Sequence, residues 1–131
     1  MEIYKEELKI INLFRKNLFS EFTLKQIMKE LGKKSYNWTH KAVNKLSKDI
    51  LISKKKGNTI VTKLNLNSPS AITQLVYLDR EQAYSKNIPF INEVIESCSK
   101  VTPYFTLLVA GSHAAGNARK NSDVDLVAIS E

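Results

Sequence analysis

The strongest constraint on the fold is a short segment, EFTLKQIMKELGKK, that specifies one helix and both of its ends. Thr23 and Gln26 have the spacing of a capping box, in which each side chain bonds to a free backbone N–H at the start of a helix. Phe22 and Ile27 occupy the two positions of a hydrophobic staple, and Gly32 suits the left-handed backbone that follows a helix. The segment therefore predicts a short helix that stops abruptly before the next element.

Amphipathic helices are predicted on both sides of this segment. Upstream, apolar residues at helical spacing form one stripe, made of Leu8, Ile11, Phe14 and Leu18. Downstream, Lys33 and Lys34 form a turn, and Ser35 can cap a helix over residues 35–51. The inner face of that helix consists of Thr39, Ala42, Val43, Leu46 and Ile50. Its outer face offers only hydrogen-bonding or cationic side chains, namely Tyr36, Asn37, His40, Lys41, Asn44, Lys45 and Lys48.

Two β-runs follow, around the turn sequence Lys55-Lys56-Gly57-Asn58. Helix, capped helix, tight turn, polar helix and basic hairpin, in this order, resemble the winged helix-turn-helix family over residues 1–66. One departure is Ile50, because many members of that family have Gly before the Leu-Ile that starts the wing.

The resemblance implies that the helix over 35–51 enters a DNA major groove. Asn37 and Asn44 then read adenine edges, and His40 donates to a base or a phosphate. The remaining contacts come from Tyr36, Lys41, Lys45 and Lys48 on the helix and from Lys55 and Lys56 at the wing tip. Trp38, at the third helical position, is expected in the core or at a hinge rather than stacked on a base.

The distribution of charge favours DNA contact over a merely solvated lysine-rich face. Residues 1–66 contain 15 Lys and Arg and 6 Asp and Glu, a net charge of +9, whereas residues 67–131 contain 5 and 7, a net charge of −2, giving +7 in total. A general richness in lysine would not confine the excess to one half of the chain.

The middle of the chain, residues 67–100, predicts a helical connector. Ser68 can cap a helix that starts at Pro69, and a second amphipathic helix follows Pro89. Their apolar stripes either pack on the C-terminal strands or pair between two chains in a dimer. Cys98, the only cysteine, is expected to be a buried thiol, because no histidine neighbours it in sequence.

Two further strands are predicted over 104–110 and 123–129, the first of them buried. In the second, Asp123 and Asp125 share a face, with Cα atoms about 6.6–6.8 Å apart. Such carboxylates can converge on two divalent ions about 3.5–4 Å apart, as in displacement at phosphorus. Oxygen-only ligands favour magnesium over zinc.

Between these strands, Gly111 allows a close or left-handed backbone, and Ser112 begins a short helix whose start suits a triphosphate. The residues resemble the minimal nucleotidyltransferase superfamily related to DNA polymerase beta. The matching pattern is an apolar strand, Gly111-Ser112, ten residues, and Asp123-Val124-Asp125-Leu126, with Ala114, Gly116, Arg119 and Ser122 also in place. The alternative is a hairpin-like unit with two exposed aspartates.

The second resemblance implies that Gly111 and Ser112 hold the phosphates of an NTP, while Asp123 and Asp125 bind Mg²⁺ and act as catalytic residues. Arg119 either reaches a phosphate or is a solvated surface residue. Ala115 stands where the family often has Arg, which removes one expected phosphate contact. His113 is expected to be a partly exposed side chain rather than a phosphate ligand.

Members of that superfamily add a third carboxylate from a later strand. Glu131 cannot supply it, because on a continued strand it would lie about 20 Å from Asp125. The two-metal site is therefore only partly present. Either the chain has been cut short, or the half-domain survives as a binding or dimerisation element, or a partner chain completes it.

We therefore expect an α/β (α+β) chain with a winged helix-turn-helix domain at 1–66, a helical connector at 67–100 and the start of a nucleotidyltransferase domain, strand-helix-strand, at 101–131. The first functional hypothesis is a DNA-binding protein fused to a magnesium-dependent domain that transfers NMP from NTP, incomplete and weak or inactive alone. The alternative is a transcriptional regulator or antitoxin-like repressor whose transferase half serves ligand binding or dimerisation. No segment predicts a membrane span or a signal peptide, so we expect a cytoplasmic protein.

Overall fold

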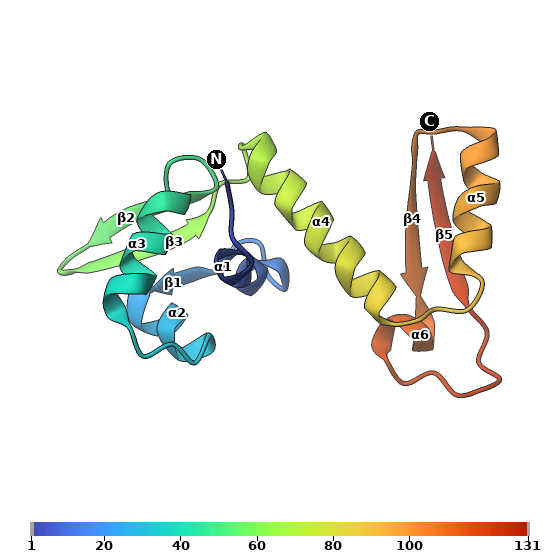
Figure 1. Ribbon diagram of the computed structural model, residues 1–131, viewed down its shortest axis with the longest axis horizontal. Coiled ribbons are helices and arrows are strands. Elements are labelled where there is room, and N and C mark those ends of the chain that lie inside the picture. The colour runs from blue at the N-terminus through green and yellow to red at the C-terminus, as the bar shows by residue number, and fades with distance from the viewer. Residues whose placement is uncertain (1, 131) are drawn as a thin grey trace. The chain divides into compact units, whose positions relative to one another are not determined.

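The computed structural model describes residues 2–130 and divides the chain into two compact units, with the boundary between Leu78 and Asp79. The elements of the first unit are α1 (Lys5–Arg15), β1 (Glu21–Thr23), α2 (Leu24–Glu30), α3 (Tyr36–Leu46), β2 (Leu51–Lys56) and β3 (Thr59–Leu64) (Figure 1). Helix α4 (Pro69–Ser85) crosses the boundary, and the second unit continues with α5 (Ile91–Val101), β4 (Phe105–Ala110), α6 (Gly111–Ala115) and β5 (Asp125–Ser130).

The helix-turn-helix forms as its capping residues predict. Gln26 N donates to Thr23 Oγ1 over 3.2 Å, and Thr23 N donates to Gln26 Oε1 over 2.8 Å, which completes the capping box of α2. Gly32, with φ +60°, ends the helix in the left-handed region. Ser35 Oγ accepts from Trp38 N over 3.2 Å and starts α3. The sharp turn between α2 and α3 therefore comes from local backbone chemistry.

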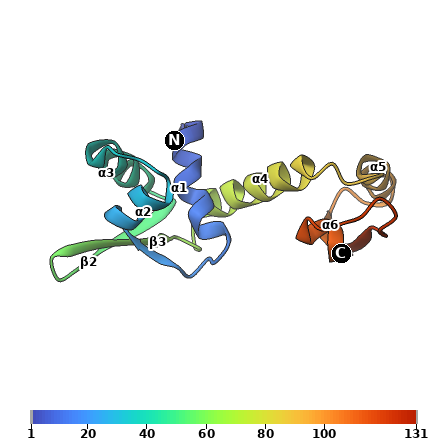
Figure 2. The ribbon, with the colours of Figure 1, turned by 90° about the horizontal axis from the view of Figure 1, so that it is seen from below.

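A three-stranded antiparallel sheet in the order β1-β3-β2 closes the first unit. The hairpin of β2 and β3 was expected, and its tip projects away from the helices (Figures 1 and 2). Strand β1 was not predicted, since three residues leading into a helix carry too little alternation to indicate a strand. It pairs with β3, with Glu21 opposite Lys63 and Thr23 opposite Val61.

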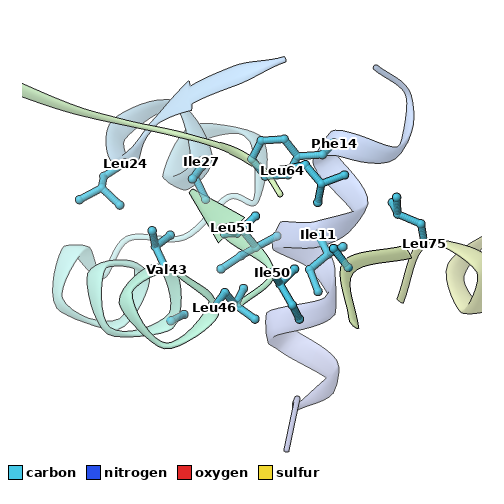
Figure 3. Close-up of a cluster of buried hydrophobic side chains, with 13 residues drawn as sticks. Ile11, Phe14, Leu24, Ile27, Val43, Leu46, Ile50, Leu51, Leu64 and Leu75 are labelled. Carbon is cyan, nitrogen blue, oxygen red and sulfur yellow. The ribbon is translucent and has the colours of Figure 1, made fainter. Parts of the chain in front are cut away.

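The core of this unit lies between the three helices and the start of the hairpin (Figure 3). Phe14 is fully buried and meets Phe22 edge to face, with ring centroids 5.1 Å apart. Leu75 reaches the same cluster from α4. The predicted stripe of the first helix is correct at its centre, but Leu18 lies beyond α1 and is 37% exposed.

Helix α3 ends at Leu46, five residues before the predicted end. Residues 47–50 form turns that fold Ile50 into the core, where it is fully buried. Asn65 fixes this turn, because its N–H donates to Ile50 O and its side-chain amide donates to Asp49 O, each over 2.9 Å. The Ile at this position therefore serves as a core residue at the entry to the wing.

The second unit is a two-stranded antiparallel sheet with α5 packed against β4 (Figure 1). Strand β4 was expected to be buried, but its side chains alternate, and Leu108 is 47% exposed on the face away from α5. Within residues 2–130 this sheet has two strands, and α5 packs on one face while Leu108 is exposed on the other. Among residues 2–130, no helix is long and apolar enough to cross a bilayer.

The division between the units differs from the predicted boundaries at 66/67 and 100/101. Residues 69–78 of α4 belong to the N-terminal unit, in which Ala71 and Leu75 are buried. Helix α5 belongs with the strands because its inner face packs on β4. The two helices predicted for the connector at 67–100 are present as α4 and α5, and they are divided between the two units.

Candidate nucleic-acid interface and acidic motif

The outer side of α3 and the turn that follows it carry the polar surface that the sequence indicates. We call the following residues the recognition face: Tyr36, Asn37, His40, Lys41 and Asn44 on the helix, and Lys48 in the turn. All of them are exposed except His40, which is half-buried, and they lie opposite Thr39, Ala42, Val43 and Leu46, which are buried. Burial of one side of the helix thus fixes which side chains face solvent.

Three members of the recognition face form an ordered row at four-residue spacing. The rings of Tyr36 and His40 are stacked, with centroids 6.0 Å apart and planes 17° apart. The side-chain amide nitrogen of Asn44 lies 3.3 Å from His40 Nδ1. Side chains spaced by four residues share one helix surface, so this row presents hydrogen-bonding groups in a preset arrangement.

Lys45, which the sequence predicts as a DNA contact, forms an ion pair within the N-terminal unit. Its Nζ lies 2.8 and 3.0 Å from the two carboxylate oxygens of Glu7 and 4.4 Å from the centroid of the Tyr4 ring. Its side chain is 29% exposed and that of Glu7 is 11% exposed. The ammonium group therefore joins α3 to α1.

Lys33, in the turn between α2 and α3, makes a similar contact with α1. Lys33 Nζ lies 2.6 Å from Glu6 and 4.9 Å from the centroid of the Trp38 ring. These contacts hold the turn between α2 and α3 against α1, and the Lys33 ammonium lowers the pKa of Glu6 to about 2. Trp38 packs partly buried on the core, as predicted.

The wing supplies the second group of cations. Gly57, with φ +58°, makes the turn at the tip, next to the predicted contacts Lys55 and Lys56. Lys56 pairs with Glu21 over 2.7 Å, and this hydrogen bond lowers the pKa of the Glu21 carboxyl. Within residues 2–130, Lys55 has no ion pair, and the same is true of Lys41 and Lys48 on the recognition face.

A hollow of about 270 Å³ lies between the recognition face and the tip of the wing. It lies between the start of α2, the start of α3 and the wing tip, and its lining includes Thr23, Lys25, Tyr36, Asn58 and Thr59. Of these five residues, only Tyr36 was predicted as a DNA contact. Lys25 could have been identified as an exposed cation in the first turn of a capped helix, whereas the approach of Asn58 and Thr59 depends on the tertiary fold.

The acidic motif lies in the second unit. Gly111 has φ +63°, as expected for a left-handed backbone, and a Cβ atom placed there would overlap the carboxylate of Asp125. The chain therefore brings the Gly-Ser step of β4–α6 directly beside the second aspartate of the Asp-x-Asp pair. Only glycine fits this approach without a shift of the Asp125 side chain.

The other aspartate is placed differently from the prediction. Strand β5 begins at Asp125, so Asp123 lies in the preceding loop and the argument from strand alternation does not apply to it. Both carboxylates are exposed. Within residues 2–130, no group of three potential ligands among His, Cys, Asp and Glu could hold a metal ion, and Glu131 lies outside the described residues.

The loop between α6 and β5 is ordered by its own hydrogen bonds. Arg119 N donates to Ser122 Oγ over 2.8 Å, and His113 Nε2 lies 3.3 Å from Ser122 O. Asn117 N donates to Ser112 O over 3.1 Å. Ser112 and His113 are half-buried, while the Arg119 side chain is exposed.

Comparison with known proteins yields similar folds and no similar sequences. No protein-family model matches the chain, and no curated protein matches it. The adhesin competence repressor AdcR of Streptococcus pyogenes superimposes with a TM-score of 0.51 and 16% identity, over 76% of this chain and 79% of that chain. Two structures of Lactococcus lactis ZitR, each 16% identical, have a TM-score of 0.45. One is a complex with DNA, which covers 76% of this chain and 73% of its own. The other is described as a zinc-responsive MarR family member and covers 77% and 74%.

The superposition on AdcR covers 76% of the chain, which is more than the winged-helix elements alone. The architecture of the N-terminal unit is thus that of a winged helix-turn-helix, as the order of its elements predicts.

Proposed function

We propose that the N-terminal unit binds duplex DNA and that the chain acts as a regulator of transcription. The observation that carries the proposal is the recognition face, a polar surface on α3 and the turn after it, in which Lys41 and Lys48 have no ion pair among the described residues. In the winged-helix architecture, this helix is the one that enters the major groove. The similarity of fold to a repressor supports a regulatory role.

The proposed contacts divide into two kinds. Lys41, Lys48 and Lys55 would neutralise phosphates and so supply affinity that depends on salt rather than on sequence. Asn44 and His40, held in the row described above, would meet base edges and supply specificity. Lys56 would leave Glu21 and bind a phosphate instead. Breaking this ion pair costs little free energy, because both side chains are exposed.

Fluorescence anisotropy with labelled genomic fragments tests the proposal. The double variant Lys41→Ala, Lys48→Ala should bind about tenfold or more weakly on every fragment, because two phosphate contacts are lost. The matched control is Lys100→Ala, a change of one exposed lysine in the second unit, which pairs with Glu96 on α5. Unchanged affinity in the double variant would refute the assignment of the recognition face.

We further propose that the regulator is a homodimer that pairs through α4. This helix leaves Ile72, Val76 and Tyr77 exposed along one side, while Ala71 and Leu75 are buried against the first unit. Neighbouring exposed apolar side chains on a helix are typical of a surface that another chain covers. A two-fold dimer would also place two recognition faces on successive turns of DNA.

A second candidate function is favoured by the contact between Gly111 and Asp125. We propose that Gly111, Ser112, Asp123 and Asp125, with Arg119, bind an NTP and Mg²⁺, and that the half-domain binds ligand without turnover by itself. Two carboxylates suit magnesium, which is usually held by one or two protein carboxylates together with water and substrate phosphates. When bound, the ion would neutralise phosphate charge and orient the phosphoryl group.

Calorimetry with ATP and MgCl₂ tests this second candidate. Wild type should bind Mg-ATP, and the variant Asp123→Asn, Asp125→Asn should lose about tenfold or more in affinity, because the metal ligands are removed. Glu93→Gln and Glu96→Gln on α5 remove the same charge from the same unit and should leave binding unchanged. Equal affinity in the aspartate variant would refute the metal site.

A further inference from the structure

A pocket of about 460 Å³ lies in the second unit, between two segments that are far apart in sequence. The connection from α4 to α5 contributes Lys86 and Asn87, and the region from α6 to β5 contributes His113, Gly116, Arg119 and Lys120. Both segments pass beside α6 in Figure 1. None of the eight residues that line the pocket is Asp or Glu.

The pocket is rich in cations, although the unit as a whole carries a negative net charge. Residues 79–131 contain 5 Lys and Arg and 7 Asp and Glu, a net charge of −2. Three of those five cations, Lys86, Arg119 and Lys120, nevertheless line this one pocket, together with His113. Cations scattered over the unit would not converge from two segments about 30 residues apart. The local potential in the pocket is therefore positive in an acidic unit.

The walls of the pocket are fixed by hydrogen bonds. Lys86 Nζ donates to the carbonyl oxygen of Ala114 and so ties the α4–α5 connection to α6. Asn87 has φ 47°, a left-handed conformation that Asn adopts more readily than most residues. On the other side, the bonds from Arg119 N to Ser122 Oγ and between His113 and Ser122 O hold the loop. The Lys86 ammonium and the backbone that carries Arg119 are thus held in place before an anion arrives.

We propose that this pocket binds a small polyphosphate through Lys86, Arg119 and Lys120, without a metal ion. Its volume is that of a site for a molecule of nucleotide size and exceeds what a single phosphate needs. Neighbouring phosphates carry several charges that can bond to different cations at once. The pocket shares Arg119 with the second proposed site, but the inference goes beyond both proposed functions, because it uses neither the recognition face nor Asp123 and Asp125 and needs no metal ion.

Binding of inorganic tripolyphosphate to the full chain in EDTA, followed by amide NMR and calorimetry, tests the proposal. Wild type should saturate with shifts centred on Asn87, Gly116 and Lys120. The variant Lys86→Gln, Lys120→Gln should bind about tenfold or more weakly, and Lys120→Gln alone should show part of that loss. The single variant keeps the test valid if loss of the Lys86–Ala114 bond disturbs the turn, because Lys120 makes no hydrogen bond or ion pair in the described structure.

Three controls separate this pocket from the other sites. Lys100→Gln should bind like wild type, and so should Asp125→Asn, because no metal is present. Lys41→Ala, Lys48→Ala should also retain the interaction. Loss of tripolyphosphate binding in the recognition-face variant would place the anion on the DNA-binding surface, and equal binding by the Lys86 and Lys120 variants and wild type would show that the pocket does not bind it. Either result would overturn the proposal.

Discussion

At the scale of single residues, Lys45 shows how a cation on the outer side of a helix can belong to the interior network. Its Nζ lies 2.8 Å from Glu7, whose side chain is 11% exposed. Replacing Lys45 by Ala would leave that carboxylate without its cationic partner in a poorly hydrated position, although the Tyr4 N–H still donates to it. We expect the free energy of unfolding to fall by about 1–2 kcal/mol, measured by urea denaturation. Lys45→Ala should weaken DNA binding less than Lys41→Ala does. A larger loss of affinity in Lys45→Ala would show that Lys45 contacts the DNA.

Glu6 makes the stability of the N-terminal unit depend on pH in the acidic range. The hydrogen bond and charge of Lys33, with a smaller contribution from Lys9, lower its pKa from 4.5 to about 2. Because the folded pKa lies below the unfolded one, the stabilisation is complete above pH 4.5 and is lost as the pH falls toward 2. Glu6→Gln should flatten this part of the stability curve, followed by the fluorescence of Trp38, the only tryptophan. An identical curve for wild type and variant would contradict the assignment.

At the scale of elements, Ser68 joins the end of the helix-turn-helix to α4. Its Oγ donates to Asp49 Oδ1 over 2.6 Å and accepts from Ala71 N over 3.2 Å. Ser68→Ala removes both bonds, so we expect a loss of about 1–2 kcal/mol in stability. The hydroxyl groups of Ser68 and Ser70 lower the pKa of Asp49, so loss of the Ser68 hydroxyl should raise this pKa toward 3.8. Ser85→Ala, at the exposed end of the same helix, is the control and should change stability by less than about 0.5 kcal/mol.

The elements also show what a sequence can and cannot predict. The ends of α2, the start of α3 and the start of α4 were predictable, because Thr23, Ser35 and Ser68 act on backbone groups only a few residues away. Strand β1 was not, since its partner β3 lies about 40 residues further along the chain.

The candidate site shows the same difference between local and remote contacts. The polar side of α3 followed from periodicity, whereas the pairing of Lys45 with Glu7 and the approach of Lys86 to α6 depend on contacts remote in sequence.

At the scale of the whole molecule, the two units combine a basic winged helix with an acidic unit that carries its own cationic pocket. The proposed dimer through α4 would link two such chains. Val76 is 53% exposed on this helix. Val76→Glu should convert a dimer of twice 14.9 kDa to a monomer in light scattering and weaken DNA binding, because a buried charge opposes association. Gln82→Glu, which adds the same charge elsewhere on α4, should remain dimeric, and a monomeric wild type would contradict the prediction.

The most direct test of DNA binding by the recognition face is the salt dependence of DNA affinity. A plot of log affinity against log salt concentration should have a slope of about −0.9 for each phosphate contact. For the variant Lys41→Ala, Lys48→Ala the slope should be shallower by about 2, because two phosphate contacts are absent. Lys100→Ala should keep the wild-type slope. If the slopes of the wild type and the double variant coincide, the recognition face does not meet the DNA backbone.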